Sequence, residues 1–374
     1  MGGPAVTVPV PPAGEHAAYD KTFDPYAVSR RPRGLLIAVV VGMALAAVLA
    51  LIPLPYAILR PGPAINTLGK DSGGTPLIEV TGAKTYPAAG ALDFTTVSVQ
   101  GGPGRRVNVW DLVGAAISPS EDIYDEDAFF PKGITEKEVK DENTAEMASS
   151  QEMAVAVALR SIGQKVTPRY RIGDFAPVAP SASVLKTGDI LLAIDKVDIT
   201  SLSVLRERVR AHQPGDKVTL RIERDGKPSE VTVTTMDAGS QAALGVILAT
   251  TYNFPYQVTI HAGDVGGPSA GLMFTLAVND VLTPGDLTGG KRIAGTGTID
   301  DSGQVGPIGG IRQKVVGAKK AGATIFLTPA DNCAELKGRT PEGIRAIRVA
   351  TFAEALAEVK ALSSGATGSL PTCN

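Results

Sequence analysis

Residues 266–271 read Gly266-Gly267-Pro268-Ser269-Ala270-Gly271, a run of small residues around one serine. Apolar residues follow at helical spacing, which predicts a helix packed on a core: Leu272, Met273, Leu276 and Ala277. We expect Pro268 in the first helical turn, where its missing N–H is not needed. Ser269 would then stand at the mouth of the helix, where free N–H groups favour negative charge. An ordinary serine N-cap is the alternative.

A lysine further along the chain supplies a partner for this serine. Four residues recur at helical spacing, so that one cation shares an apolar face: Ile311, Lys314, Val315 and Ala318. Burial disfavours the charged form of a lysine and lowers its pKa, and a neutral amine can accept the proton of Ser269. These are the components of a Ser-Lys hydrolase. The alternative is a lysine that snorkels, covering apolar surface with its stem.

The order of the motifs resembles the proteolytic domain of the Lon peptidases over residues 243–360. After His261 and the Gly-Pro-Ser-Ala-Gly run come Thr296-Gly297-Thr298-Ile299, Gly303-Gln304-Val305, Pro307-Ile308-Gly309-Gly310-Ile311 and Lys314. The resemblance implies an α+β domain with Ser269 as nucleophile, Lys314 as general base and Thr296 as a supporting hydroxyl. Gly267, Pro268 and Ala270 are assigned to the turn and its oxyanion site.

The chain departs from the Lon pattern just before the serine. Lon enzymes usually carry Pro-Lys-Asp-Gly ahead of Pro-Ser-Ala-Gly, whereas Val265-Gly266-Gly267 stand here and the acidic residue is missing. The loop between His261 and Ser269 is also shorter. Both changes leave the serine and the lysine intact, and they affect substrate preference and the ordering of the loop.

Other chemistries find less support. The chain has 3 histidines and no His-Glu-x-x-His motif, so we expect no metal site. A Ser-His-Asp triad would combine Ser269 and His261 with Asp264 or Asp280, without geometric support from the sequence. The stretch Gly285–Arg292 resembles a phosphate-binding loop but lacks its Ser/Thr, so we interpret it as a turn and expect no ATP and no cofactor.

The N-terminal part predicts a membrane anchor. We interpret residues 1–33 as a flexible tail and residues 34–53 as a transmembrane helix, because Gly34 to Ile52 carries no charged side chain. The arginines before it, Arg30, Arg31 and Arg33, favour a cytoplasmic N-terminus. The remainder would then lie outside the cell membrane. A cleavable signal peptide is the alternative.

Residues 56–165 predict a mixed α/β region outside the membrane. We expect short strands at Tyr56–Leu59, Pro76–Val80 and Leu92–Val99, and a helix over Thr144–Gly163. Between them, residues 121–142 form an acidic insertion, which we expect to be a solvated loop and helix. It lacks the ligand spacing of a calcium-binding EF-hand loop.

Residues 166–240 resemble a PDZ domain of the bacterial protease type. The run Leu185-Lys186-Thr187-Gly188-Asp189-Ile190 opens a strand, and we expect a helix over Leu202–Ala211 and strands over Lys217–Arg224 and Ser229–Thr235. The resemblance implies capture of an extended peptide by strand addition. The Gly-Leu-Gly-Phe carboxylate loop is not recognisable. The alternative is a packing domain that only positions its neighbour.

Composition sets the remaining bounds. A net charge of -2 and 44% hydrophobic residues argue against a nucleic-acid partner and against a disordered chain. The two cysteines, Cys333 and Cys373, either pair and fasten the C-terminal tail, residues 363–374, or remain free thiols.

The whole chain resembles the PDZ-and-Lon membrane proteases of Gram-positive bacteria, a multidomain α+β architecture. The resemblance implies a serine endopeptidase that cleaves extended or unfolded polypeptides without ATP, in a ring-shaped homo-oligomer such as a hexamer. A catalytically silent PDZ scaffold is the alternative, although it would need neither Ser269 nor Lys314. A processing enzyme resembling signal peptidases is a third, which the PDZ-like domain and the motif order disfavour.

Overall fold

The computed structural model describes residues 30–71, 73–365 and 370–373. Most of the predicted tail, residues 1–29, lies outside the described residues. The chain forms two compact units, residues 1–53 with 108–110, and residues 54–107 with 111–374.

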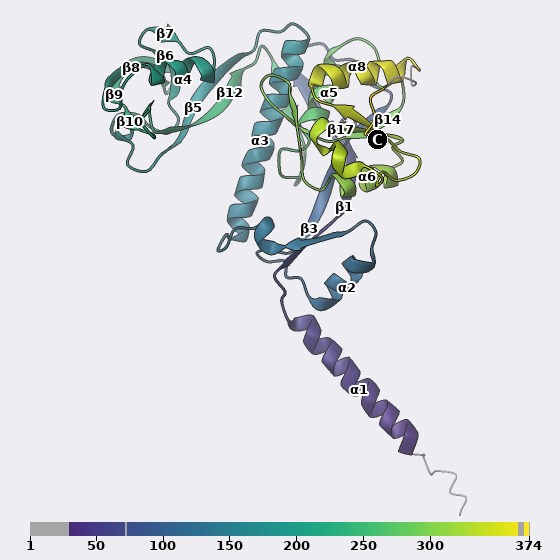
Figure 1. Ribbon diagram of the computed structural model, residues 1–374. Helices are drawn as coiled ribbons and strands as arrows, with labels where there is room; N and C mark the ends of the chain where they lie inside the picture. Colours follow the sequence, from purple (N-terminus) through teal and green to yellow (C-terminus); the bar gives the residue numbers. More distant parts are fainter. Residues whose placement is uncertain (1–29, 72, 366–369, 374) are drawn as a thin grey trace, which may run out of the picture. The chain divides into compact units, whose positions relative to one another are not determined.

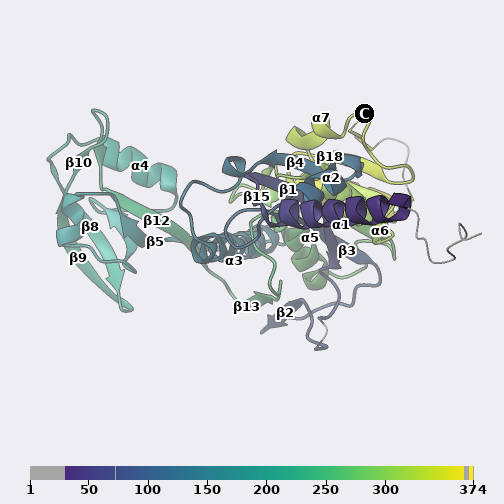
Figure 2. The same ribbon diagram turned by 90° about the horizontal axis from the view of Figure 1, so that it is seen from below.

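The first unit contains α1, Arg30–Leu51, which Figures 1 and 2 show as one uninterrupted helix. The span Arg33–Leu51 has a mean hydropathy of 2.8 and is long and apolar enough to cross a membrane. A signal sequence near an N-terminus meets the same criteria of length and composition. The predicted segment is residues 34–53. The helix begins at Arg30, before the start of that segment, and ends at Leu51, before its last residue.

A six-stranded sheet is the centre of the second unit. Its order is β18-β17-β14-β3-β1-β4, and β3, β14, β17 and β18 run parallel while β1 is antiparallel to both of its neighbours. The strands are β1 Tyr56–Asn66, β3 Ala91–Gln100, β4 Asp122–Asp125, β14 Arg292–Gly295, β17 Ile325–Pro329 and β18 Arg345–Val349. The sequence had suggested a separate region at residues 56–165. Its strands instead complete the sheet of the Lon-like part.

The acidic insertion, expected to be a loop and helix, also contains a strand, β4, and its residues 136–142 are helical. β4 pairs with the first residues of β1, from Tyr56 opposite Asp125 to Leu59 opposite Asp122. It lies at the edge of the sheet, where charged residues can keep their side chains in water. The short turn η1, Glu126–Ala128, follows it, and α2, Val109–Ile117, precedes it.

A single long helix begins inside the acidic insertion and continues beyond it (Figure 1). α3 spans Glu136–Ser161 and begins before the predicted Thr144, because Thr135 and Glu138 form a reciprocal capping box at its start. The first half of α3 is mostly exposed, whereas the stretch from Ala154 to Leu159 is buried. This buried half belongs to the same apolar core as α5, Gly271–Leu282.

The helix α5 is buried on every side, so the predicted one-sided packing was too narrow. Ten consecutive positions from Gly271 to Asp280 are buried, and the Phe274 ring lies 5.3 Å from that of Phe94 on β3.

The remaining helices of this unit are α6 Ile311–Lys320, η3 Ala330–Asn332, α7 Cys333–Leu336 and α8 Phe352–Ser363. Two small antiparallel pairs of strands complete it: β2 Ile78–Thr81 with β13 Gln257–Ile260, and β15 Thr298–Ile299 with β16 Val305–Gly306.

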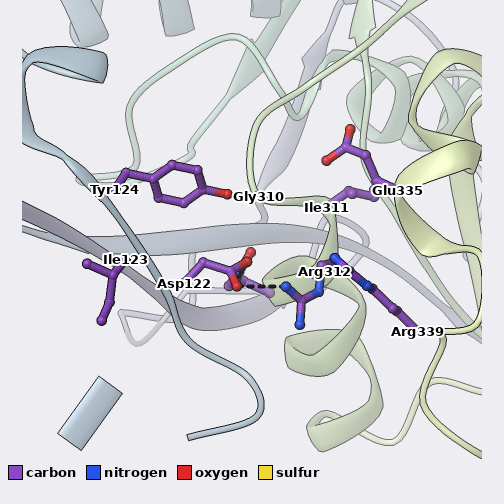
Figure 3. A pocket seen from close by; sticks show the side chains of 9 residues that line it. Asp122, Ile123, Tyr124, Gly310, Ile311, Arg312, Glu335 and Arg339 are labelled. Atoms are coloured by element: carbon purple, nitrogen blue, oxygen red, sulfur yellow. Dashed lines mark hydrogen bonds and ion pairs between the residues drawn. The ribbon is translucent and has the colours of Figure 1, made fainter. Parts of the chain in front are cut away.

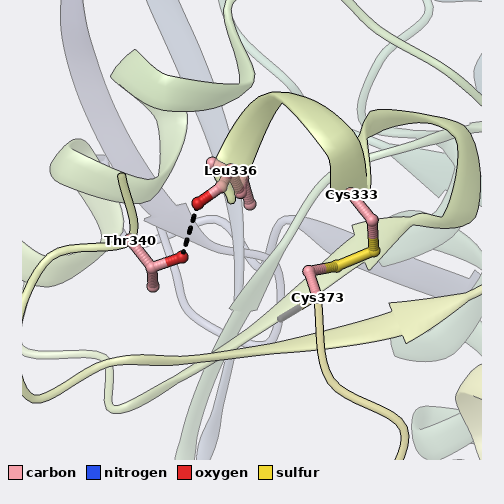
Figure 4. The surroundings of a disulfide bond; sticks show 4 residues. All are labelled: Cys333, Leu336, Thr340 and Cys373. Carbon is pink, nitrogen blue, oxygen red and sulfur yellow. Dashed lines mark hydrogen bonds between the residues drawn. A yellow bond between two sulfur atoms is a disulfide. The ribbon is translucent and has the colours of Figure 1, made fainter. Parts of the chain in front are cut away.

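The two cysteines form a disulfide (Figure 4). It joins Cys333 at the start of α7 to Cys373, whose N–H donates to the carbonyl of Ala346 on β18. The end of the predicted tail is therefore fastened along the edge strand of the sheet. The middle of the tail, residues 366–369, lies outside the described residues.

The PDZ-like residues form a sheet of their own with the path β12-β5-β6-β8-β9, and β7 pairs with β6. The predicted strands and helix are confirmed; the elements are β5 Thr167–Phe175, η2 Pro180–Ser183, β6 Ile190–Ile194, β7 Val197–Asp198, α4 Leu202–Arg210, β8 Lys217–Arg224, β9 Lys227–Thr234, β10 Met236–Asp237, β11 Ala242–Ala243 and β12 Val246–Asn253. A separate apolar cluster, with Ile172, Leu191 and Leu220, fills this sheet's core. β12 lies beyond the predicted boundary at residue 240, yet it pairs with β5 along its whole length.

Candidate active site

Ser269 lies in a turn immediately before α5. The helix begins at Gly271 with Ala270 as its N-cap, so Pro268 stands outside the first turn, which corrects that expectation. The N-cap makes no side-chain hydrogen bond, and Ser269 is therefore not the capping serine of the alternative interpretation. Its hydroxyl is available for other contacts.

Two residues after β14 hold the nucleophile turn from one side. The carbonyl of Ser269 accepts a hydrogen bond from the N–H of Gly297, at 2.8 Å, and another from the Thr296 hydroxyl, at 2.9 Å. Gly297 has φ +149°, and its own carbonyl accepts from the N–H of Leu272 in α5. The serine is thus fixed through its backbone, and these bonds leave its hydroxyl available for other contacts.

The helix α3 holds the same turn from another side. The Ser150 hydroxyl donates to the carbonyl of Pro268 at 2.9 Å, and the N–H of Gly267 donates to the carbonyl of Asn143 at 2.9 Å. Because the Gly267 N–H is engaged in this way, Gly267 is a turn residue and not an oxyanion donor in this conformation. The N–H of Ala270, directly after the serine, remains the candidate among the predicted residues.

Lys314 meets Ser269 from α6. The left-handed Gly310 (φ 69°) lets the chain enter this helix, and the Lys314 side chain is only 2% exposed. Its Nζ donates to the Ser269 hydroxyl at 2.6 Å and to the Thr296 hydroxyl at 3.1 Å. Burial lowers the pKa of Lys314 from 10.5 to about 7. The three predicted residues therefore form one connected cluster.

This arrangement can deprotonate a hydroxyl near neutral pH. A lysine with a pKa of about 7 is substantially neutral under physiological conditions, and a neutral amine accepts a proton. The amine is within hydrogen-bond reach of the serine, which is the geometric requirement for a general base. The snorkelling alternative does not apply, since the lysine points inward.

The alternative triad is not assembled. His261 bonds to the carboxylate of Glu79 at 3.1 Å, and Asp264 is exposed. Asp280 is buried near the far end of α5, where it accepts the N–H of Leu287 and where burial raises the pKa of its carboxyl to about 6. None of these groups contacts the Ser269 hydroxyl among the contacts of the described residues.

The stretch that resembles a phosphate-binding loop is a turn, as predicted. The Asp286 carboxylate accepts the N–H groups of Thr288 and Gly290 and the Thr288 hydroxyl. Its backbone donors are therefore already used to close the turn.

A large cleft of 1360 Å³ opens beside the nucleophile turn. Its lining includes Val97 and Val99 on β3, residues 260–266 before the serine, and the segment from Phe129 to Gln151. Gly266, one of the residues that line the cleft, stands three positions before Ser269 in the chain. The cleft therefore reaches the loop that carries the serine.

A smaller hollow of 340 Å³ lies between β4 and the start of α6 (Figure 3). There Asp122 accepts hydrogen bonds from the Arg312 guanidinium at 2.6 Å and from the Gln313 amide at 2.7 Å. These bonds connect the acidic insertion to the two residues that precede Lys314. Burial raises the pKa of Tyr124, which also lines this hollow.

The serine, the lysine and the threonine stand in a part of the chain that matches a family of serine peptidase domains. Residues 247–363 match the Lon protease (S16) C-terminal proteolytic domain, and residues 161–235 match the PDZ domain. The chain therefore carries a Lon-type peptidase domain together with a PDZ domain.

Curated relatives carry the same likeness over short stretches. A Lon protease 2 of Herpetosiphon aurantiacus is 38% identical over 92 residues, covering 24% of this chain and 11% of the relative. A Lon protease of Heliobacterium modesticaldum is 30% identical over 187 residues, covering 46% of this chain and 20% of the relative. The chain thus spans a fifth or less of the length of these relatives.

Among solved structures, the PDZ domain of an SdrC-like protein from Listeria monocytogenes is 20% identical, with a TM-score of 0.21. The match covers 21% of this chain and 86% of that one.

Two contributors to the site had not been predicted. Ser150 and Asn143 lie in α3, outside the stretch that resembles Lon, and they contact backbone groups of the nucleophile turn. A hydrogen bond to a distant carbonyl leaves no periodic pattern in a sequence.

Proposed function

We propose that this chain is a membrane-anchored serine endopeptidase in which Lys314 activates Ser269. The observation that carries the proposal is the 2.6 Å contact between the two side chains at a lysine that is 2% exposed. A buried amine without a carboxylate partner is costly to the fold, and it is expected where function requires a neutral base.

The mechanism follows from the geometry. Neutral Lys314 removes the proton of Ser269, whose oxygen attacks the peptide carbonyl, and the resulting ammonium returns a proton to the leaving amine. Water then resolves the acyl-enzyme by the same route in reverse. The N–H of Ala270 at the start of α5 is proposed to bind the oxyanion, and the Thr296 hydroxyl to orient the lysine.

We propose hydrolysis of extended or unfolded polypeptides without ATP. The Gly285–Arg292 turn is supported by its own Asp286 rather than open to phosphates. The large cleft, by contrast, has the dimensions of a site for an extended chain rather than for a small molecule. A ring-shaped homo-oligomer stays a prediction from the resemblance.

The PDZ domain is proposed to capture substrate by strand addition. β12 ends the strand path of its sheet, so that no described strand pairs with its outer side, and Leu244-Gly245, with φ +68° at the glycine, leads directly into it. This apolar-glycine turn was missed because it follows the other PDZ strands and falls beyond the predicted boundary at residue 240.

The proposed location is the outer side of a cell membrane, with α1 as a single-pass anchor and the N-terminus in the cytoplasm. The arginines before the apolar span support this orientation. The Cys333–Cys373 disulfide supports an oxidising compartment for the second unit.

The test is cleavage of an unfolded protein by the full chain in detergent, without ATP. Ser269→Ala and Lys314→Ala should each lose at least about a thousandfold in kcat. Lys320→Ala, an exposed lysine of the same helix, is the matched control and should keep full activity. Activity that survives Lys314→Ala would contradict the proposed base, and activity that requires ATP would contradict the proposed independence from it.

A further inference from the structure

The strand β3 has an unpaired edge inside the large cleft. β14 pairs with β3 only from Ala91 to Phe94, where the register ends opposite Gly295. β1 occupies the other edge of β3 as far as Gln100. From Thr95 to Gln100, no described strand pairs with the edge that β14 leaves free, and two residues of this stretch, Val97 and Val99, line the cleft.

This edge passes the catalytic cluster. The Val97 side chain lies against Gly310, the residue that starts the helix of Lys314, so closely that a Cβ on Gly310 would meet it at 2.7 Å. The cleft lining also includes Gly266, three positions before Ser269 in the chain. A strand added along β3 would therefore run between the two loops that deliver Lys314 and Ser269.

The segment outside the Lon match supplies an apolar wall. Phe130, Ile134 and Val139 are partly buried in the cleft lining, and Met147 on α3 is 5% exposed. Phe130 is seated on Gly102, where a Cβ would meet its ring at 2.6 Å. The aromatic ring is thus held in place by a glycine that leaves room for it.

Charges around this wall are mainly negative. The cleft lining holds four carboxylates and two basic side chains: Glu136, Glu142, Glu146 and Asp264, with Arg105 and Lys140. An acidic substrate side chain would be repelled, whereas an apolar or basic one would be accepted.

We propose that the cleft binds the polypeptide substrate as an extended strand along the free edge of β3, with its apolar side chains against the wall of Phe130, Ile134 and Met147. This inference rests on the proposed peptidase function and adds a substrate class to it. It makes residues 129–148 the determinants of specificity. The backbone of β3 supplies affinity that does not depend on sequence.

The test separates binding from cleavage. The full chain carrying Ser269→Ala is titrated with fluorescent apolar peptides that end in a C-terminal amide, so that no free carboxylate is offered to the PDZ domain. One backbone nitrogen is methylated at a time. Strand addition predicts a loss of affinity of about tenfold at every second position and little change between them.

A charge placed in the cleft tests the apolar wall. Ala148 lines the cleft and is exposed, and Ala145 is exposed on the same helix without lining it. Ala148→Glu should weaken binding of an acidic peptide by up to about fivefold and favour a basic one, and Ala148→Lys should do the reverse. Ala145→Glu is the matched control and should change neither.

The outcomes distinguish the two proposals. Uniform effects of methylation, or equal effects of the substitutions at 145 and 148, would overturn the strand-addition model. If the alternating pattern appears but the unsubstituted protein cleaves none of the bound peptides, the cleft assignment stands and the peptidase proposal fails. Cleavage with an unchanged KM for every charged peptide in Ala148→Glu would overturn the cleft assignment alone.

Discussion

Lys314 is bonded through Nζ to two hydroxyl groups, those of Ser269 and Thr296. Both are neutral, so neither compensates the positive charge of a protonated amine as a carboxylate would. Burial is the cause of its lowered pKa, which is about 7. The residue is therefore a source of both reactivity and instability.

Replacing Lys314 with Met is expected to stabilise the protein near neutral pH. Between pH about 7 and 10.5, the unfolded chain holds a proton on Lys314 that the folded chain lacks, so stability rises with pH by up to about 1.4 kcal/mol per pH unit. Lys314→Met cannot titrate, and its advantage should be largest below pH 7 and shrink toward pH 10.5. Thermal melting across this range measures it, with Lys320→Met as the exposed control. An advantage that grows with pH would contradict the lowered pKa.

Thr296 is expected to act through the lysine and the turn. Thr296→Val removes the hydroxyl that donates to the Ser269 carbonyl and accepts from Lys314, and kcat should fall by about 10 to 100-fold with little change in KM. Thr296→Ser should restore most of the loss. Thr328→Val is a matched control, because Thr328 is also fully buried but its hydroxyl has no partner. A purely structural role would lower stability without this split between kcat and KM.

The sequence predicted the three residues of the catalytic cluster, but it did not predict the residues that hold the nucleophile turn in place. Ser269, Lys314 and Thr296 lie in short motifs whose order is recognisable, and the structure brings them together. Ser150 of α3 could not be predicted, since its contact to Pro268 joins residues 118 positions apart.

At the scale of elements, local sequence patterns predicted the PDZ strands correctly but did not predict β4. β8 and α4 follow clear alternation and helical spacing. β4, by contrast, is a charged edge strand that is stabilised by pairing with β1 and by the bond of Asp122 to Arg312. The acidic composition of the segment predicts neither β1 nor Arg312 as a partner. Judged from the segment alone, this composition favours exposure to solvent.

The disulfide is expected to stabilise the edge of the six-stranded sheet. Cys333 and Cys373 close a loop with a sequence separation of 40, so removing the bond with Cys333→Ser and Cys373→Ser should cost about 2–4 kcal/mol of unfolding free energy. Denaturant unfolding of the full chain measures this cost. A reducing agent should reproduce the loss in the unsubstituted protein and have no further effect on the double variant. Equal stability of both proteins would contradict the pairing.

At the scale of the whole molecule, the unexpected feature is a sheet assembled from both sides of the PDZ domain. β3 pairs with β14 through Ala91 and Arg292, and the PDZ-matching residues 161–235 lie between them in sequence. Strand spacing shows that a strand exists but not which strand lies beside it. The sequence therefore suggested neighbouring domains, whereas in the structure the PDZ domain is inserted between two strands of the peptidase domain's sheet.

The anchor makes a prediction about the mature protein in cells. If α1 is retained as a transmembrane helix, the chain should resist extraction by alkaline carbonate and should keep its residues 1–53 by mass spectrometry. External protease should digest residues 54–374 in intact cells whose walls have been removed. A mature chain that starts after residue 53 and leaves the membrane would show that the apolar span is a signal sequence.

The pH dependence of kcat/KM tests the central claim most directly. The full chain in detergent, cleaving an unfolded protein without ATP, should gain activity as Lys314 loses its proton, with a midpoint near pH 7 and a plateau above it. Lys320→Ala should give the same curve and Lys314→Ala should give none. A midpoint that remains near 10.5, or a curve that survives the loss of Lys314, would contradict the account.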